Sequence, residues 1–206
     1  AIAVAAMVAV LGISASSREG LQQEIRALGT NLLQVQAGEG FGRGTGELPD
    51  TASEMVSRIA PVSAVSSIAT VDATVRRTDL VSEGITGGIG VFAADADLAS
   101  TLNIELRDGV FLNDATTEYP AVVLGAVTAQ TLGIDDVADA FRVMIGGQWF
   151  DVVGIMDPVA AAEGLDRGVL VGYGAAEPYV VGAAIVPEVL YVRTDDGAVE
   201  DVRNVL

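Results

Sequence analysis

The chain contains no cysteine, no histidine and no lysine among its 206 residues. Without cysteine there are no disulfides, so the fold depends on its core alone and the cysteines give no information on the compartment. Ser-His-Asp and Cys-His nucleophilic systems and the usual zinc sites all need His or Cys. A Walker loop needs a Lys to reach the terminal phosphates of ATP. These sites are therefore excluded, and any nucleotide-driven work must be done by a partner.

Positive charge is also scarce. The chain has 28 acidic residues against 11 basic ones, all of them Arg, for a net charge of -17. Such a surface repels phosphates and anionic headgroups, so we expect no nucleic-acid partner and no peripheral lipid binding. Half of the residues are hydrophobic, which indicates a folded protein with one sizeable core or two small subdomains.

Residues 1–13 form an uncharged apolar run. A complete transmembrane helix needs roughly twenty apolar residues, so this run is either the outer part of a span or a buried Ala-rich helix. No basic residue precedes Arg18, which argues against a signal peptide. We prefer the span and keep the buried helix as the alternative.

The apolar run continues into an amphipathic stretch. Leu21, Ile25 and Leu28 recur at helical spacing, and Gly29 supplies a stop. No Pro interrupts residues 1–30, so we expect the end of a membrane span and an exposed stalk helix to form one rigid rod. Such a rod can carry motion out of a bilayer.

The rest of the chain alternates short strands and short helices in an α+β order. Glycine at every second position from 38 to 46 predicts an exposed loop, and Gly146-Gly147 predicts a hairpin. Expected strands cover residues 32–37, 62–81 (one long strand or a bent pair), 85–92, 121–124, 141–145, 149–155, 169–171 and 189–193. Expected helices cover residues 49–59, 93–102, 126–132, a short piece near Ala175, and 198–206.

Several fragments, in their order and spacing, resemble the periplasmic core domain of MacB-type ABC transporter permeases, a group that includes FtsX- and LolC-like permeases. The hairpin 143–155, which ends in Val-Val-Gly, is the most specific of them. Val110 departs from the family, which has Arg there, and residues 139–142 lack the usual glycine. The other fragments are Gly29-Thr30-Asn31-Leu32-Leu33, Val62 after Ala60-Pro61, Gly109-Val110-Phe111-Leu112 and Ala121-Val122-Val123-Leu124-Gly125.

The resemblance implies an architecture of three parts. Residues 1–30 would be the end of a transmembrane span and the stalk helix. Residues 31–94 and 186–206 would form a porter-like α+β subdomain, and residues 95–185 an inserted, mixed α/β second subdomain. The predicted fold class is therefore α+β.

The resemblance also implies a function. The chain would be an extracytoplasmic, non-catalytic domain at the cell membrane, with a cytoplasmic ATP-binding cassette ATPase and a second permease copy as partners. It would couple ATP-driven movement of stalk helices to export or extraction of an antibiotic, peptide or lipoprotein. We expect no catalytic, cofactor-binding or metal-binding residue in it. The alternative is a membrane-anchored extracellular ligand-binding or adhesion domain.

Two patterns admit a chemical interpretation. The segment Gly88-Ile89-Gly90-Val91-Phe92-Ala93 matches a loose dinucleotide fingerprint with Asp108 downstream, but it falls inside an expected strand, so we interpret it as a strand or bulge. Three acidic pairs could offer oxygen ligands to a hard cation such as calcium, but none has EF-hand spacing. We interpret them as helix caps and turn residues. They are Asp95/Asp97, Asp135/Asp136 and Asp195/Asp196.

Two further interpretations stay open. A carboxylate pair is all that glycoside hydrolysis requires, although a single Trp leaves few aromatic side chains to stack on a sugar. Trp149, Tyr173 and Tyr179 are either contacts for a partner or cover for the sheet, and we prefer the structural interpretation because single exposed aromatics are common.

Overall fold

The computed structural model describes residues 31–206 except 38–47, 50, 83, 85–86 and 196. The predicted stalk at residues 1–30 and the glycine loop at 38–46 lie outside the described residues. Within the described part, no helix is long and apolar enough to cross a membrane.

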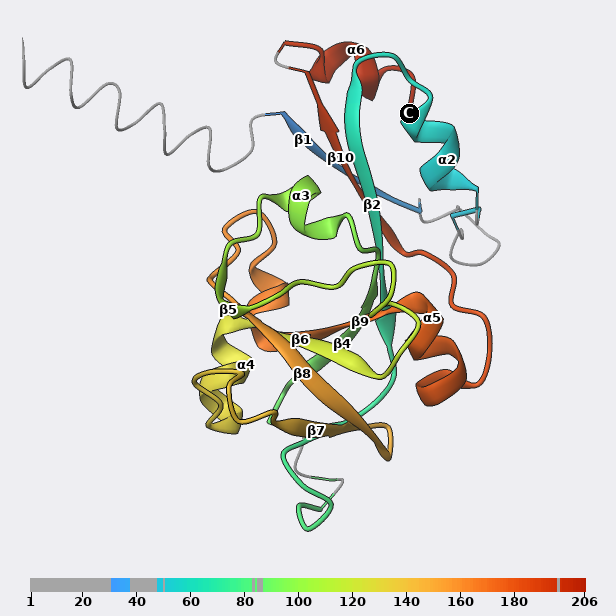
Figure 1. Ribbon diagram of the computed structural model, residues 1–206. Helices are drawn as coiled ribbons and strands as arrows, with labels where there is room; N and C mark the ends of the chain where they lie inside the picture. The colour runs from blue at the N-terminus through green and yellow to red at the C-terminus, as the bar shows by residue number, and fades with distance from the viewer. Residues whose placement is uncertain (1–30, 38–47, 50, 83, 85–86, 196) are drawn as a thin grey trace, which may run out of the picture. The chain divides into compact units, whose positions relative to one another are not determined.

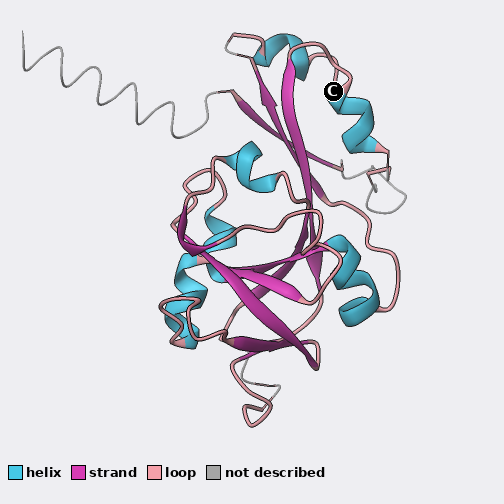
Figure 2. Ribbon diagram, viewed as in Figure 1, coloured by secondary structure: helices cyan, strands magenta, loops and turns pink. Residues whose placement is uncertain are grey.

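The described residues form one mixed sheet with short helices around it (Figures 1 and 2). The helices are α2 (Ala52–Ser57), α3 (Leu98–Leu102), α4 (Ala126–Leu132), α5 (Tyr173–Ala176) and α6 (Val199–Arg203), with a 3₁₀ helix η1 (Glu163–Arg167) and a π-helical turn η2 (Glu177–Val181). The strands are β1 (Leu32–Gln36), β2 (Val62–Val71), β3 (Val75–Arg76), β4 (Gly90–Ala94), β5 (Leu106–Gly109), β6 (Ala121–Leu124), β7 (Arg142–Ile145), β8 (Gln148–Met156), β9 (Gly168–Gly172) and β10 (Val189–Thr194).

The strand order shows that part of the sheet closes on itself. The order is β1-β10-β2-β4-β9-β6-β8-β7-β3, with β5 attached to β8. Only residues 72–74 separate β2 from β3, so the pairing that starts on β2 returns through β7 to the same stretch of chain. Residues 62–76 therefore act as one bent strand that belongs to both ends of this circuit.

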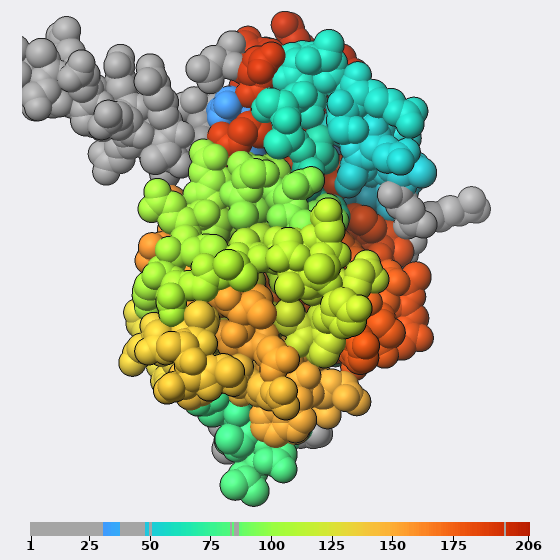
Figure 3. All heavy atoms as spheres, viewed as in Figure 1, coloured from blue at the N-terminus to red at the C-terminus, as the bar shows by residue number. Residues whose placement is uncertain are grey.

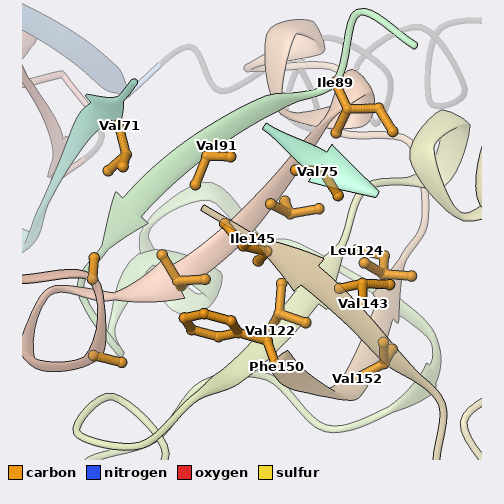
Figure 4. Packing of buried hydrophobic residues seen from close by; sticks show 14 of the residues in the cluster. Val71, Val75, Ile89, Val91, Val122, Leu124, Val143, Ile145, Phe150 and Val152 are labelled. Atoms are coloured by element: carbon orange, nitrogen blue, oxygen red, sulfur yellow. The ribbon is translucent and has the colours of Figure 1, made fainter. Parts of the chain in front are cut away.

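The circuit surrounds the largest hydrophobic cluster (Figure 4). Every strand of the circuit contributes a buried side chain, and the Phe150 ring is fully buried. Burying a side chain of this size contributes about 1.5–3 kcal/mol. Representatives from β2, β3, β4, β9, β6, β8 and β7 are Val71, Val75, Val91, Val171, Val122, Phe150 and Ile145.

Two smaller clusters lie on either side of the sheet near β10 and the first part of β2. One packs α3 against the sheet through Leu98 and Leu102, and includes Ile68 and Tyr191. The other packs α2 and α6 through Val56 and Val202. Because side chains alternate along a strand, Leu33 and Val35 of β1 face the α2/α6 cluster, and Leu32 faces the α3 cluster.

Most of the predicted elements are confirmed, and the α+β class is confirmed with them. The strand predicted at 62–81 is a bent pair, β2 and β3, that ends at Arg76, and Gly146-Gly147 connects the hairpin β7–β8. The helix predicted at 93–102 is wrong at its start, because Ala93 and Ala94 belong to β4 and pair with both β2 and β9. The strand predicted at 85–92 is wrong for residues 87–89, because β4 begins at Gly90, and residues 85–86 lie outside the described part. Strand β5 and η1 were not predicted.

Gly125 lies where two segments of backbone approach closely. Its φ of -68° and ψ of 155° suit any residue, so conformational freedom is not the reason for glycine. Instead, a Cβ here would collide with the backbone oxygens of Leu165 and Asp166, while the Gly125 N–H donates to the Gly168 carbonyl. This contact holds the start of α4 against η1 and β9.

We predict that Gly125→Ala lowers the free energy of unfolding by about 1–3 kcal/mol, because backbone must move to admit the methyl group. Gly164→Ala is the matched control, since a Cβ at Gly164 meets nothing within 4 Å. Urea unfolding of the purified protein followed by circular dichroism measures both. Equal effects of the two substitutions would contradict this explanation.

Candidate functional site at the start of strand β1

Asn31 is the first described residue, and it follows directly on the predicted stalk. Its backbone carbonyl accepts a hydrogen bond from the Thr194 N–H (2.9 Å), and its side-chain Nδ2 donates to the Thr194 carbonyl (2.9 Å). These two bonds join positions 163 apart in the sequence. Asn31 therefore holds the start of β1 against the end of β10.

Arg193 extends this connection toward α3. Its Nη1 donates to Asn31 Oδ1 (3.0 Å), and its Nε donates to the Thr101 carbonyl in the last turn of α3 (2.8 Å). One guanidinium thus joins Asn31, directly before β1, to α3, which packs on β2 and β10. The planar fork of Arg suits this double contact, and Lys cannot reproduce it.

Thr101 also connects α3 to β2. Its side chain and that of Ser66 are fully buried, with 2.9 Å between the two hydroxyl oxygens, and Thr101 Oγ1 also donates to the Asp97 carbonyl (3.0 Å). Buried polar groups stabilise only when they are paired, so this contact fixes the position of α3 along β2. We call the set Asn31, Ser66, Thr101, Arg193 and Thr194 the junction.

The junction is positively charged but contains no ion pair. Among the residues that the structure describes, no carboxylate lies within ion-pair distance of Arg193, and both of its bonds go to neutral oxygens. Partial burial lowers the pKa of Arg193 from its usual value, but the group stays protonated near neutral pH. The junction can therefore position groups through hydrogen bonds.

A second feature is an acidic groove of about 480 Å³ between α2 and the segment 94–118. Figure 3 shows α2 (cyan) and this segment (green to yellow-green) side by side on one face. Its polar lining is dominated by carboxylates, which favours cationic groups over anions. The acidic residues of this lining are Glu54, Asp95, Asp97, Asp114 and Glu118.

Asp95 and Tyr173 of this lining belong to a small hydrogen-bonded cluster. Asp95 Oδ2 accepts from the Ser67 N–H (2.6 Å) and lies 2.8 Å from Ser67 Oγ, which in turn lies 3.1 Å from the Tyr173 hydroxyl. Burial, with smaller contributions from Asp95 and Glu188, raises the pKa of Tyr173 above its usual value. The cluster joins the end of β4 to β2 and α5.

Asp108, Asp136 and the glycine fingerprint have structural roles. Asp97 precedes α3 without a side-chain cap hydrogen bond, and Asp196 lies outside the described residues. Asp108 Oδ2 accepts from the Val137 N–H (2.8 Å), and Asp136 Oδ1 accepts from the Ala138 N–H (3.0 Å). Gly90 starts β4 instead of preceding a helix, which supports the strand interpretation of the fingerprint. Within the described part of the chain, no three acidic side chains gather closely enough to hold a metal ion.

The aromatic candidates separate into two kinds. Trp149 and Tyr179 are exposed, and Trp149 stands on β8 opposite Met144 of β7. Tyr173 instead belongs to the Ser67–Asp95 cluster, a role that no sequence pattern indicated. The junction was also missed, because Arg193 and Asn31 are far apart in sequence; the only signal was that Asn31 lies in one of the fragments with a family resemblance.

Comparison with known proteins gives a family match along nearly the whole chain. The family model described as "MacB-like periplasmic core domain" matches residues 1–205. The chain belongs to this family. The resemblance inferred from the short fragments is thereby confirmed.

Curated relatives agree with the family match. The chain is 28% identical over 211 residues to the macrolide export ATP-binding/permease protein MacB of Azoarcus sp. (strain BH72), covering 99% of this chain and 31% of that protein. It is also 28% identical over 153 residues to the protein of the same name from Agrobacterium fabrum, covering 71% of this chain and 23% of that protein. This MacB-like chain thus spans less than a third of the length of either relative.

Solved structures show the same fold. The periplasmic region of MacB from Actinobacillus actinomycetemcomitans superposes with a TM-score of 0.63 at 15% identity, over 88% of this chain and 85% of that one. The extracellular domain of the ABC-type transporter YknZ from Gram-positive bacteria gives 0.61 at 16% identity, over 83% and 86%. The α+β arrangement of this MacB-like domain is therefore shared by domains of very different sequence.

We predict that Arg193→Ala lowers the free energy of unfolding by about 1–2 kcal/mol, because it removes two charge-assisted hydrogen bonds that are partly shielded from solvent. Arg203→Ala is the control: Arg203 is exposed and its described ion pair is with Glu200 on the same helix (2.7 Å), so an effect below about 0.5 kcal/mol is expected. Urea unfolding compares the two. A loss at Arg203 as large as at Arg193 would count against the junction.

We also predict that stability falls at alkaline pH. The folded-state pKa of Tyr173 and that of Tyr191 are both raised by burial, so the folded state binds these protons more tightly than the unfolded state does. The stability from this difference is complete below about pH 10, where unfolded Tyr ionises, and is lost as the pH rises through the folded-state pKa values. Tyr173→Phe should flatten the decline above about pH 10, measured by urea unfolding across the pH range. An unchanged slope would contradict the assignment.

Proposed function

We propose that this chain is the extracytoplasmic domain of an ABC transporter permease at the cell membrane, coupling ATP-driven movement of stalk helices to export or extraction of a substrate. An antibiotic, a peptide or a lipoprotein fits the proposal. The family membership supports the permease, and the junction is the observation that supports the coupling.

The junction suits a transmitter because it lies directly after the predicted stalk. A movement of residues 1–30 must pass through Asn31, which is hydrogen-bonded to both Thr194 and Arg193. Arg193 passes the displacement to Thr101, and thus to α3. In the proposed architecture this step crosses from the porter-like subdomain (31–94 and 186–206) to the inserted subdomain (95–185).

The energy would come from an ATP-binding cassette ATPase in another chain or domain. The chain contains no Lys, so it cannot form a standard Walker loop, and its curated relatives are named as ATP-binding/permease proteins. A second permease copy would complete the assembly. Stable ATP hydrolysis by this chain alone would overturn the proposal.

We predict that the stalks of two copies move relative to each other when ATP binds. The chain lacks native Cys, so Arg18→Cys, Gln22→Cys and Arg26→Cys each introduce a single thiol. In membranes of cells that express the protein from its own gene together with its ATPase, crosslinking between copies should change on adding ATP. Crosslinking that never responds to ATP would instead favour an anchored ligand-binding or adhesion domain.

A second readout reports whether the movement passes the junction. Ser100 is exposed on α3, so the maleimide labelling rate of Ser100→Cys should depend on ATP in the otherwise unchanged protein. Asn31→Ala should abolish this dependence while the stalk response remains. Asn204→Ala, at an exposed position after α6, serves as the control and should change neither readout. A normal α3 response in Asn31→Ala would show that the coupling bypasses the junction.

A further inference from the structure

Among the described residues, strand β1 pairs with β10 on one side only, so its other side is an open edge of the sheet. The Asn31 carbonyl accepts from Thr194 of β10, so the backbone groups of residue 31 face β10. Successive residues of an antiparallel strand face opposite sides, so those of Leu33 and Val35 also face β10. The N–H and C=O groups of Leu32, Gln34 and Gln36 therefore face the open side.

Of the strand edges in the described part of the chain, only that of β1 is unprotected. Three described strands have a single neighbour: β1, β3 and β5. Strand β3 has only two residues and contains Arg76, and β5 contains Arg107 and Asp108. Short length and charge are the usual devices that prevent pairing between molecules. Strand β1 has five residues, Leu-Leu-Gln-Val-Gln, with no charge, no Pro and no bulge in its pairing.

The edge is also complementary to itself. If two copies of β1 pair in antiparallel orientation about Gln34, Gln34 lies opposite Gln34 and Leu32 lies opposite Gln36. All of these residues present backbone groups to the open side, so each of their N–H groups would meet a C=O group of the other copy. No charge opposes a like charge, although each chain carries a net charge of -17.

The side chains fit the same arrangement. Leu33 of one copy lies opposite Val35 of the other, on the face that packs against α2 and α6, so the apolar face would continue across the pair. A hollow of about 250 Å³ lies along the strand, lined by Leu33, Gln34, Val35, Gln36, Arg203 and Leu206.

We propose that the open edge of β1 pairs in antiparallel register with β1 of a second copy of this chain, so that one sheet runs through both copies. The inference rests on the proposed association of two permease copies, and it assigns the surface where they meet. The contact would lie next to the junction, so each copy would sense movement at the other's Asn31.

The test uses single-Cys variants of the protein in membranes of cells that express it from its own gene, with a short bis-methanethiosulfonate crosslinker. Directly opposed residues in this register have Cα atoms about 5.5 Å apart, so Gln34→Cys should give a crosslinked dimer. When the two variants are expressed together in one membrane, Leu32→Cys should crosslink to Gln36→Cys. Neither variant should crosslink to a second copy of itself. Gln148→Cys, exposed at the start of β8, is the matched control and should stay monomeric.

The outcomes separate this inference from the proposed function. If Gln22→Cys crosslinks between copies and Gln34→Cys does not, the copies associate by another surface and the β1 pairing is overturned. If neither crosslinks, the association of two copies fails as well. Crosslinking at Gln148→Cys equal to that at Gln34→Cys means random collision, and it also overturns the pairing.

Gln34→Pro checks that the backbone carries the contact. The lost N–H faces the open edge and bonds to no described residue, so the fold should persist, as Pro is tolerated at such edge positions. The crosslinked dimer between Leu32→Cys and Gln36→Cys should no longer form when both chains also carry Gln34→Pro. An unchanged yield overturns the inference. A third outcome is that Gln34→Pro stops substrate movement although Gln34→Cys gives no crosslink. In that case the edge of β1 binds a different strand, such as an exported peptide, and the β1–β1 pairing is overturned too.

Discussion

The fold depends on one bent strand, residues 62–76. Its first part pairs with β10, its second part with β4, and its end, after residues 72–74, with β7. The same stretch thus opens and closes the circuit of strands around Phe150, and also carries the pairing that holds β10 and β1. The clusters on the two sides of β10 share this strand as well, through Ile68 on one side and Val65 on the other. A displacement of β2 along its own axis would disturb all three clusters at once.

This shared strand explains why the junction is placed where it is. Ser66 lies midway along β2 and contacts Thr101, so α3 is fixed to the element that also organises the closed circuit. Arg193 reaches the same helix from β10, and Asn31 joins from the chain entry. A rigid sheet with helices fixed to it transmits small displacements better than a loop does, because packed interiors deform little. The structure thus combines a rigid sheet with the hydrogen-bonded junction at the start of β1.

Sequence patterns located the elements whose local signal is strong. The strand Ala121–Leu124 was predicted to the residue, since burial on both faces leaves a continuous hydrophobic stretch. The helix Ala126–Leu132 was also predicted to the residue. Strand β5 was missed because Leu106–Gly109 is short and half polar, and it is extended only through its pairing with β8. Ala93 and Ala94 favour helix locally, but two neighbouring strands override that preference. The contact between Asn31 and Arg193 spans 162 positions, and no local pattern encodes it.

The pairing of β1 with β10 has a consequence for how the protein is made. Strand β1 is synthesised before its partner strand β10 (Val189–Thr194), and residues 37–188 separate the two. Until β10 has been synthesised, both sides of β1 present unpaired backbone groups in an uncharged, partly apolar segment. Nascent chains in that interval are exposed to strand exchange with one another, because distant contacts of this kind form late in folding. Biogenesis of this domain is therefore expected to depend on how soon β10 follows β1 during synthesis, and slow elongation through residues 37–194 should increase aggregation.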